Sequence, residues 1–159
     1  MRKQSGFSLV ELLIVVAIIL IICAIAIPNM FRARINANET SAIGSLRTIN
    51  TAELTYLTTY PKTGYSADLP SLGGSSCTSP DSTSACIIDN GLANATAASA
   101  PKTGYYFTYA LNANLGYTLL GDPAYWNHSG TKRFYTDSTG VIRFNATNQT
   151  AVATDPAIQ

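Results

Sequence analysis

The stretch "GFSLVELLIVVAIILIICAIAIP", residues 6–28, decides the fold of this protein. Apart from Ser8 and Glu11, every residue between Phe7 and Ile27 is apolar, and this run is 21 residues long. A helix rises about 1.5 Å per residue, so the run would span roughly 31 Å, the thickness of the hydrocarbon core of a bilayer. The sequence therefore predicts a helix that is able to cross a membrane.

Glu11 separates this run from two common kinds of apolar segment. A cleavable secretory signal has a shorter apolar region of about 7–15 residues, so the "AIA" at residues 24–26 is a poor candidate for its cleavage site. A simple membrane anchor is also disfavoured, because an ionisable residue within a span usually has a function and a partner. Glu11 lies near the start of the helix, where headgroups are within reach and the helix dipole favours an anion.

The N-terminal segment resembles that of the type IV pilins and the related pseudopilins. The resemblance covers residues 1 to about 60 and rests on a short basic leader that ends in Gly6, followed by Phe7, Glu11 and an apolar helix that reaches Pro28. It implies that residues 1–6 are a leader peptide, that a prepilin peptidase cleaves between Gly6 and Phe7, and that Phe7 is then N-methylated. The six-residue leader and the phenylalanine are similar to those of the type IVa branch.

The same resemblance implies a role for Glu11 in assembly, together with Phe7 and Pro28. Cleavage creates an amine at Phe7, and Glu11 of one subunit would meet this amine on a neighbouring copy. The desolvation of two charges in an apolar filament core offsets much of their attraction, so we expect the pair mainly to set the axial register. The implied partners are further copies of the chain in a helical filament, the prepilin peptidase, an inner-membrane assembly platform and, before assembly, membrane lipid.

Pro28 is predicted to kink the helix or open it locally rather than end it. Apolar residues resume at helical spacing after it, so we expect a membrane-spanning and filament-core segment at 7–28 and an amphipathic helix at 29–60. The apolar face is predicted to contain Ile35, Ile43, Leu46, Leu54 and Leu57, and Ser45 is predicted to lie on the outward face. Pro61 and Gly64 are predicted to end the helix.

Residues 61–104 are predicted to form a connector, with one short helical turn between Asp68 and Leu72. Cys77 and Cys86 flank the polar loop "CTSPDSTSAC", which indicates a disulfide and an oxidising, extracytoplasmic location. A metal site is disfavoured because no further thiolate or imidazole ligands lie nearby. Many type IVa pilins close a loop near the C-terminus with a disulfide, and this chain departs from that pattern because no cysteine follows Cys86.

Residues 105–159 change to the alternating pattern of strands. In "YYFTYAL", residues 105–111, every second residue is predicted to lie on one face. A turn at 112–116 leads to "YTLLG", and "KRFYT" and "VIRFN" form a hairpin with Asp137 and Gly140 as turn residues. We therefore predict an α+β fold, in which the long N-terminal helix packs on a roughly four-stranded antiparallel sheet.

Composition excludes several classes of function. The formal net charge is only +1, which argues against a nucleic-acid-binding protein, whose affinity depends on neutralising phosphates. Lys132, Arg133 and Arg143 are interpreted as a solvated strand face, and Asp122 and Asp137 as turn residues rather than calcium ligands. The chain has one histidine, His128, and no recognisable catalytic motif, so we predict neither an enzyme nor a cofactor.

Three functional hypotheses follow from these observations. The first is the major subunit of a type IV pilus, held in the inner membrane as a precursor and then assembled into a filament on the cell surface. The second is a pseudopilin of a type II secretion system, and the third is a binding protein or enzyme held by a single span. Motility and adhesion would be properties of the assembled filament.

Overall fold

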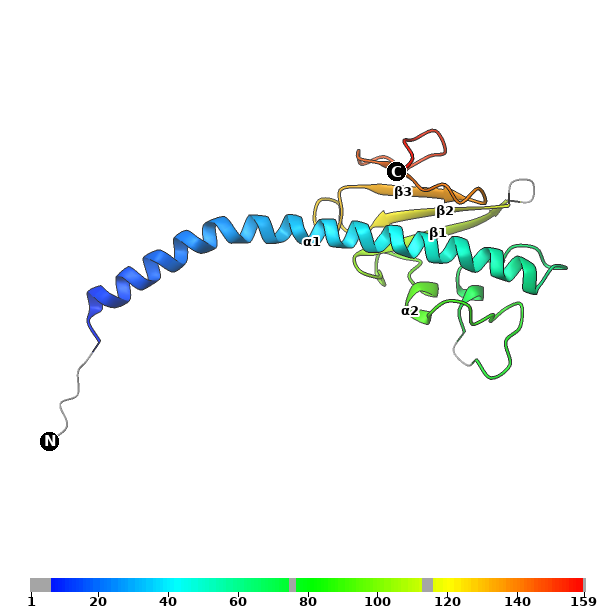
Figure 1. Cartoon of the computed structure of the whole chain (residues 1–159), viewed down its shortest axis with the longest axis horizontal. Helices are drawn as coiled ribbons and strands as arrows, with labels where there is room; N and C mark the ends of the chain where they lie inside the picture. Colours follow the sequence, from blue (N-terminus) through cyan, green and yellow to red (C-terminus); the bar gives the residue numbers. More distant parts are fainter. Residues whose placement is uncertain (1–6, 75–76, 113–115, 159) are drawn as a thin grey trace. The chain divides into compact units, whose positions relative to one another are not determined.

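A computed structural model describes residues 7–74, 77–112 and 116–158 of the chain. Its first element is the helix α1, Leu9–Thr59, which is 51 residues long and contains Pro28 (Figure 1). The predicted helix over residues 7–60 is therefore confirmed, and Pro28 does not end it. The chain divides into two compact units, Met1–Arg34 and Ile35–Gln159, and α1 contributes to both.

The second unit contains one antiparallel sheet. Its strands are β1 (Tyr105–Asn112), β2 (Gly116–Pro123), β3 (Arg133–Asp137) and β4 (Arg143–Asn145), and they lie side by side in sequence order. The register places Gly121 of β2 between Phe107 of β1 and Phe134 of β3. The predicted α+β fold with four antiparallel strands is confirmed, whereas the central residues of the predicted turn at 112–116 lie outside the described residues.

The core of the second unit lies between the sheet and the C-terminal part of α1, which runs along the strands in Figure 1. Alternate residues of the strands supply mainly aromatic side chains to this core, and the helix supplies aliphatic side chains together with Tyr56. Its fully buried members include Leu46, Ile49, Tyr56, Tyr105, Phe107, Leu119 and Phe134. Burial of each such side chain contributes roughly 1.5–3 kcal/mol relative to exposure, so this contact holds the helix to the sheet.

Leu54 and Ser45 lie on other sides of α1 than predicted. Leu54 was placed on the apolar face but is 57% exposed, and Ser45 was placed outward but is buried. The face that packs on the sheet passes through Ala42, Leu46 and Ile49, and Ser45 lies beside it. Leu54 falls on the opposite side of the helix.

The connector contains two short helices. The 3-10 helix η1, Pro70–Leu72, matches the turn predicted between Asp68 and Leu72. The helix α2, Asn90–Ala93, was not predicted, because four residues are too few to show a helical period. Asp89 caps α2 by accepting a hydrogen bond from the Leu92 N–H at 3.0 Å.

The C-terminal residues cover the outer edge of the sheet. The N–H of Ile158 donates to the Ile142 carbonyl at 2.9 Å, and the N–H of Phe144 donates to the Pro156 carbonyl at 3.0 Å. The unpaired backbone groups of an edge strand can pair with other chains, so this tail protects β4 by covering its edge.

Candidate functional site

The N-terminal unit presents an apolar helix surface that its own chain does not cover. Of residues 7–34, every side chain is exposed except that of Cys23, which is half-buried. The exposed fraction is 75% for Phe7 and 78% for Leu9. An apolar surface of this size is not left in water, so lipid or other protein chains must cover it.

The length and composition of this helix fit a membrane span. One helix among the described residues, α1, is long and apolar enough to cross a membrane, by length and composition only. The span contains one acidic residue, Glu11, which lies in the first turn of α1 and is exposed. The helix dipole places partial positive charge at this end, which favours a carboxylate there.

The structure places the predicted processing and assembly residues along this unit. Gly6 lies outside the described residues, and Phe7 lies two residues before the start of α1 at Leu9. Glu11 follows Phe7 by four residues, and Pro28 lies within the helix. Glu11 is predicted to contact the Phe7 amine of a second copy of the chain. The structure of one chain does not test this contact, which stays a prediction.

The same segment matches a known family. Residues 1–27 match the family described as the prokaryotic N-terminal methylation motif. The chain carries the N-terminal signal of the type IV pilins. This type IV pilin signal contains Phe7, Glu11 and most of the exposed apolar surface.

Two curated proteins are similar to the start of the chain, the part that carries the type IV pilin signal. The type IV wide pilus major component PilA4 of Thermus thermophilus is 58% identical over 40 residues, which cover 25% of this chain and 30% of the relative. The type IV major pilin protein PilA of Myxococcus xanthus is 41% identical over 54 residues, 34% of this chain and 24% of the relative. The chain thus matches less than a third of the length of each, and no solved structure matches it significantly.

Behind the pilin signal, a buried carboxylate joins α1 to the sheet. Glu39 accepts hydrogen bonds from the Thr131 N–H at 2.9 Å and from the Thr131 hydroxyl at 2.8 Å, and it forms an ion pair with Lys132 at 2.9 Å. Burial raises the pKa of Glu39, but these hydrogen bonds and the lysine outweigh it, so the pKa lies below its usual value. The ionised carboxylate therefore stabilises this junction.

The pKa of a second buried carboxylate on α1 is shifted in the opposite direction. Glu53 is fully buried and accepts hydrogen bonds from the N–H and the hydroxyl of Ser66, with the N–H bond at 3.1 Å. Burial raises the pKa of Glu53, and the hydrogen bonds from Ser66 offset only part of that effect. Neither glutamate was predicted to be buried, although one spacing pattern includes both. Intervals of three or four residues separate Glu39, Ala42, Leu46, Ile49, Glu53 and Tyr56.

The charged residues of the sheet correct two interpretations. Asp122 was interpreted as a turn residue, but it is buried within β2 and pairs with Arg133 at 2.9 Å. Lys132 and Arg133 each pair with a buried carboxylate, which the interpretation as a solvated strand face did not include, while the Lys132 side chain stays 42% exposed. Asp137 does act in a turn, as predicted: it accepts from the Thr139 N–H at 2.9 Å, and its carbonyl accepts from the Gly140 N–H at 2.9 Å.

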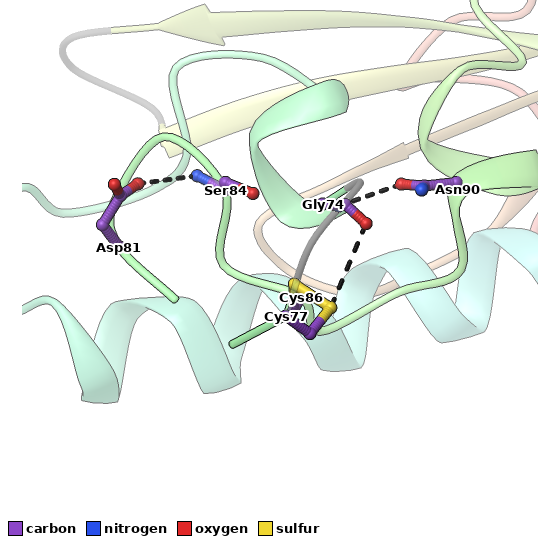
Figure 2. Close-up of a disulfide and its surroundings, with 6 residues drawn as sticks. All are labelled: Gly74, Cys77, Asp81, Ser84, Cys86 and Asn90. Carbon is purple, nitrogen blue, oxygen red and sulfur yellow. Dashed lines mark hydrogen bonds between the residues drawn. A yellow bond between two sulfur atoms is a disulfide. The ribbon is translucent and has the colours of Figure 1, made fainter. Parts of the chain in front are cut away.

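The predicted disulfide is confirmed. Cys77 and Cys86 are bonded, with 5.8 Å between their Cα atoms. Figure 2 shows the bridge close to two hydrogen bonds that order the loop: Asn90 accepts from the Gly74 N–H, and Asp81 accepts from the Ser84 N–H, each at 3.0 Å.

The disulfide-bonded loop is also tied to the helix. The hydroxyl of Tyr56 on α1 donates to the Ser82 carbonyl at 2.6 Å. The ring of Tyr56 lies 4.9 Å from that of Tyr60, the contact that their spacing of four residues allows. Tyr56 therefore holds the loop on the C-terminal part of α1, while the disulfide closes the loop itself.

Proposed function

We propose that this chain is the major subunit of a type IV pilus. One observation carries the proposal: the exposed apolar half of α1, with Glu11 as its one carboxylate, lies in the segment that matches the methylation motif and the two pilin relatives. Such a surface suits two environments in turn. It lies in lipid while the subunit waits in the inner membrane, and it packs against identical helices in the filament.

Processing prepares the N-terminus for assembly. A prepilin peptidase removes residues 1–6 by cleavage between Gly6 and Phe7, and the new amine at Phe7 is methylated. Glu11 of one subunit then faces the Phe7 amine of its neighbour. Because desolvation offsets much of the attraction between these charges, the pair selects the axial register, and the apolar surfaces supply the cohesion.

Assembly needs work from outside the chain. The apolar helices leave lipid, which is already apolar, so their association gains little from the hydrophobic effect. An assembly platform in the inner membrane is therefore the expected partner. The second unit, with its sheet and its disulfide-bonded loop, forms the outer surface of the filament, and motility or adhesion belongs to the assembled fibre.

Mass spectrometry of fibres sheared from the cell surface tests this function. We expect a chain that begins at methylated Phe7 and contains the intact disulfide between Cys77 and Cys86. A Gly6→Val variant, which alters only the cleavage site, should retain residues 1–6 and yield few fibres. Fibres built from chains that still begin at Met1 would contradict the processing, and absence of the chain from surface fibres would favour a type II secretion pseudopilin.

A further inference from the structure

A shallow groove lies on the N-terminal unit just beyond the predicted span. Its volume is about 300 Å³, and it is lined by Ile27, Met30, Phe31 and Arg34. Ile27, Phe31 and Arg34 are spaced by four and three residues, which places them on one face of the helix. The groove therefore combines three apolar side chains with one cation at its C-terminal end.

The guanidinium of Arg34 has no carboxylate partner among the described residues. Their salt bridges join other pairs. The next acidic residue along the helix is Glu39, and its carboxylate is held by Thr131 and Lys132. The charge of Arg34 is thus available to an anion from outside the chain.

The position of Arg34 matches the depth of lipid headgroups. If the run 7–27 crosses the hydrocarbon core, Arg34 lies about 10 Å beyond its end along the helix axis. The headgroup layer is about 5–7 Å thick on each side of the core. Side chains of a helix lean toward its N-terminus, and long cationic side chains extend to the interface, so the guanidinium reaches back to this layer.

We propose that this groove binds an anionic phospholipid while the subunit waits in the membrane. Arg34 binds the phosphate through two parallel N–H donors, a geometry that a guanidinium provides. The upper part of an acyl chain lies against Met30 and Phe31, which are 77% and 61% exposed in the single chain. The proposal rests on the membrane insertion that belongs to the proposed function.

Arg32 provides a matched control within the same turn of the helix. It carries the same charge and is exposed, but it does not line the groove. At 100° per residue it lies about 200° around the helix from Arg34. If the chain were attracted only to the general charge of an anionic surface, the two arginines would contribute equally to lipid binding. A specific site in the groove would depend on Arg34 and not on Arg32.

Electron paramagnetic resonance with spin-labelled lipids tests the proposal on the full-length chain. The chain is inserted into phosphatidylcholine vesicles that contain traces of spin-labelled phosphatidylglycerol or spin-labelled phosphatidylcholine. We expect the wild-type chain to retain phosphatidylglycerol preferentially, and Arg34→Gln to lower that preference about fivefold. Arg32→Gln should lower it less than twofold. Arg34→Lys keeps the charge but loses the paired donors of the guanidinium, so its preference should lie between those of the wild type and Arg34→Gln.

Three results would overturn the proposal. Equal losses in the two glutamine variants would show attraction by surface charge only, and an unchanged preference in Arg34→Gln would show no site. If Arg34→Gln kept the normal lipid preference but formed few fibres, the groove would bind a neighbouring copy of the chain and not a lipid. Failure of the wild-type chain to insert into phosphatidylcholine alone would instead count against the proposed function.

Discussion

Glu39 of α1 and Lys132, which directly precedes β3, form an ion pair with 2.9 Å between Oε2 and Nζ. The pair is asymmetric, because the glutamate side chain is 5% exposed and the lysine side chain is 42% exposed. The buried carboxylate depends on its partners, while the lysine remains close to water. This junction fixes the helix on the sheet at the N-terminal end of the second unit.

A Glu39→Gln substitution is expected to lower the free energy of unfolding by about 1.5–3 kcal/mol at pH 7, the usual range for hydrogen bonds to a charged group. The folded-state pKa of Glu39 lies below its usual 4.5, so its contribution is present above that pH and is lost as the pH falls through the folded pKa. Denaturation of the full chain in detergent between pH 3 and pH 8 measures this. Thr40→Ala, at an exposed neighbour, is the control, and a constant difference at all pH values would contradict the assignment.

Glu53→Gln should behave in the opposite way. The folded-state pKa of Glu53 lies above its usual 4.5, so its contribution is full below that pH and is lost as the pH rises through the folded pKa. At pH 7 the variant should be as stable as the wild type or more stable, because a neutral amide avoids the burial of a charge and still bonds Ser66. The same pH series measures this, and a strong loss of stability at pH 7 would refute the electrostatic account.

Removal of the disulfide should destabilise the second unit. The double substitution Cys77→Ser and Cys86→Ser opens a loop with a sequence separation of 9. The loop-entropy relation gives a loss of about 2–3 kcal/mol. Thermal unfolding with and without reductant checks this: reductant should lower the Tm of the wild type and leave the double variant unchanged. Cys23→Ala serves as the control because that cysteine lies outside the second unit.

Two glycines make a matched test of packing. A Cβ on Gly130 would clash with the hydroxyl oxygen of Tyr105, which donates to the Lys132 carbonyl, whereas a Cβ on Gly44 would meet nothing within 4 Å. Gly130→Ala should therefore cost about 1–3 kcal/mol, and Gly44→Ala in the exposed face of α1 should gain about 0.5–1 kcal/mol. Chemical denaturation in detergent measures both, and equal effects would show that the close approach at Gly130 is unimportant.

The register role of Glu11 is tested by Glu11→Ala. The variant should insert into the membrane normally, because it loses a charge from an apolar helix, and it should yield few filaments. Quantification of the chain in the membrane and in sheared fibres separates these effects, with Ser8→Ala as the neighbouring control. Normal fibre yield from Glu11→Ala would refute the role.

Much of the fold is readable from the sequence because its signals are long or regular. The apolar run after Phe7, the resumption of helical spacing beyond Pro28 and the alternation from Tyr105 each extend over many residues. The pairing of Cys77 with Cys86 could be predicted because they are the only cysteines outside the apolar run. The four-residue helix α2 was missed because it is shorter than the period that would reveal it.

The sequence alone determined the apolar helix, its single carboxylate Glu11 and the type IV pilin signal, since these depend on which residues follow one another. Only the tertiary structure decided the roles of Glu39, Glu53 and Asp122, because the cost of burying a charge depends on partners that are distant in sequence. Glu39 meets Lys132 across the junction of helix and sheet, and Asp122 meets Arg133 across two strands. Packing brings these groups together, and no short stretch of the sequence shows that they will lie close in space.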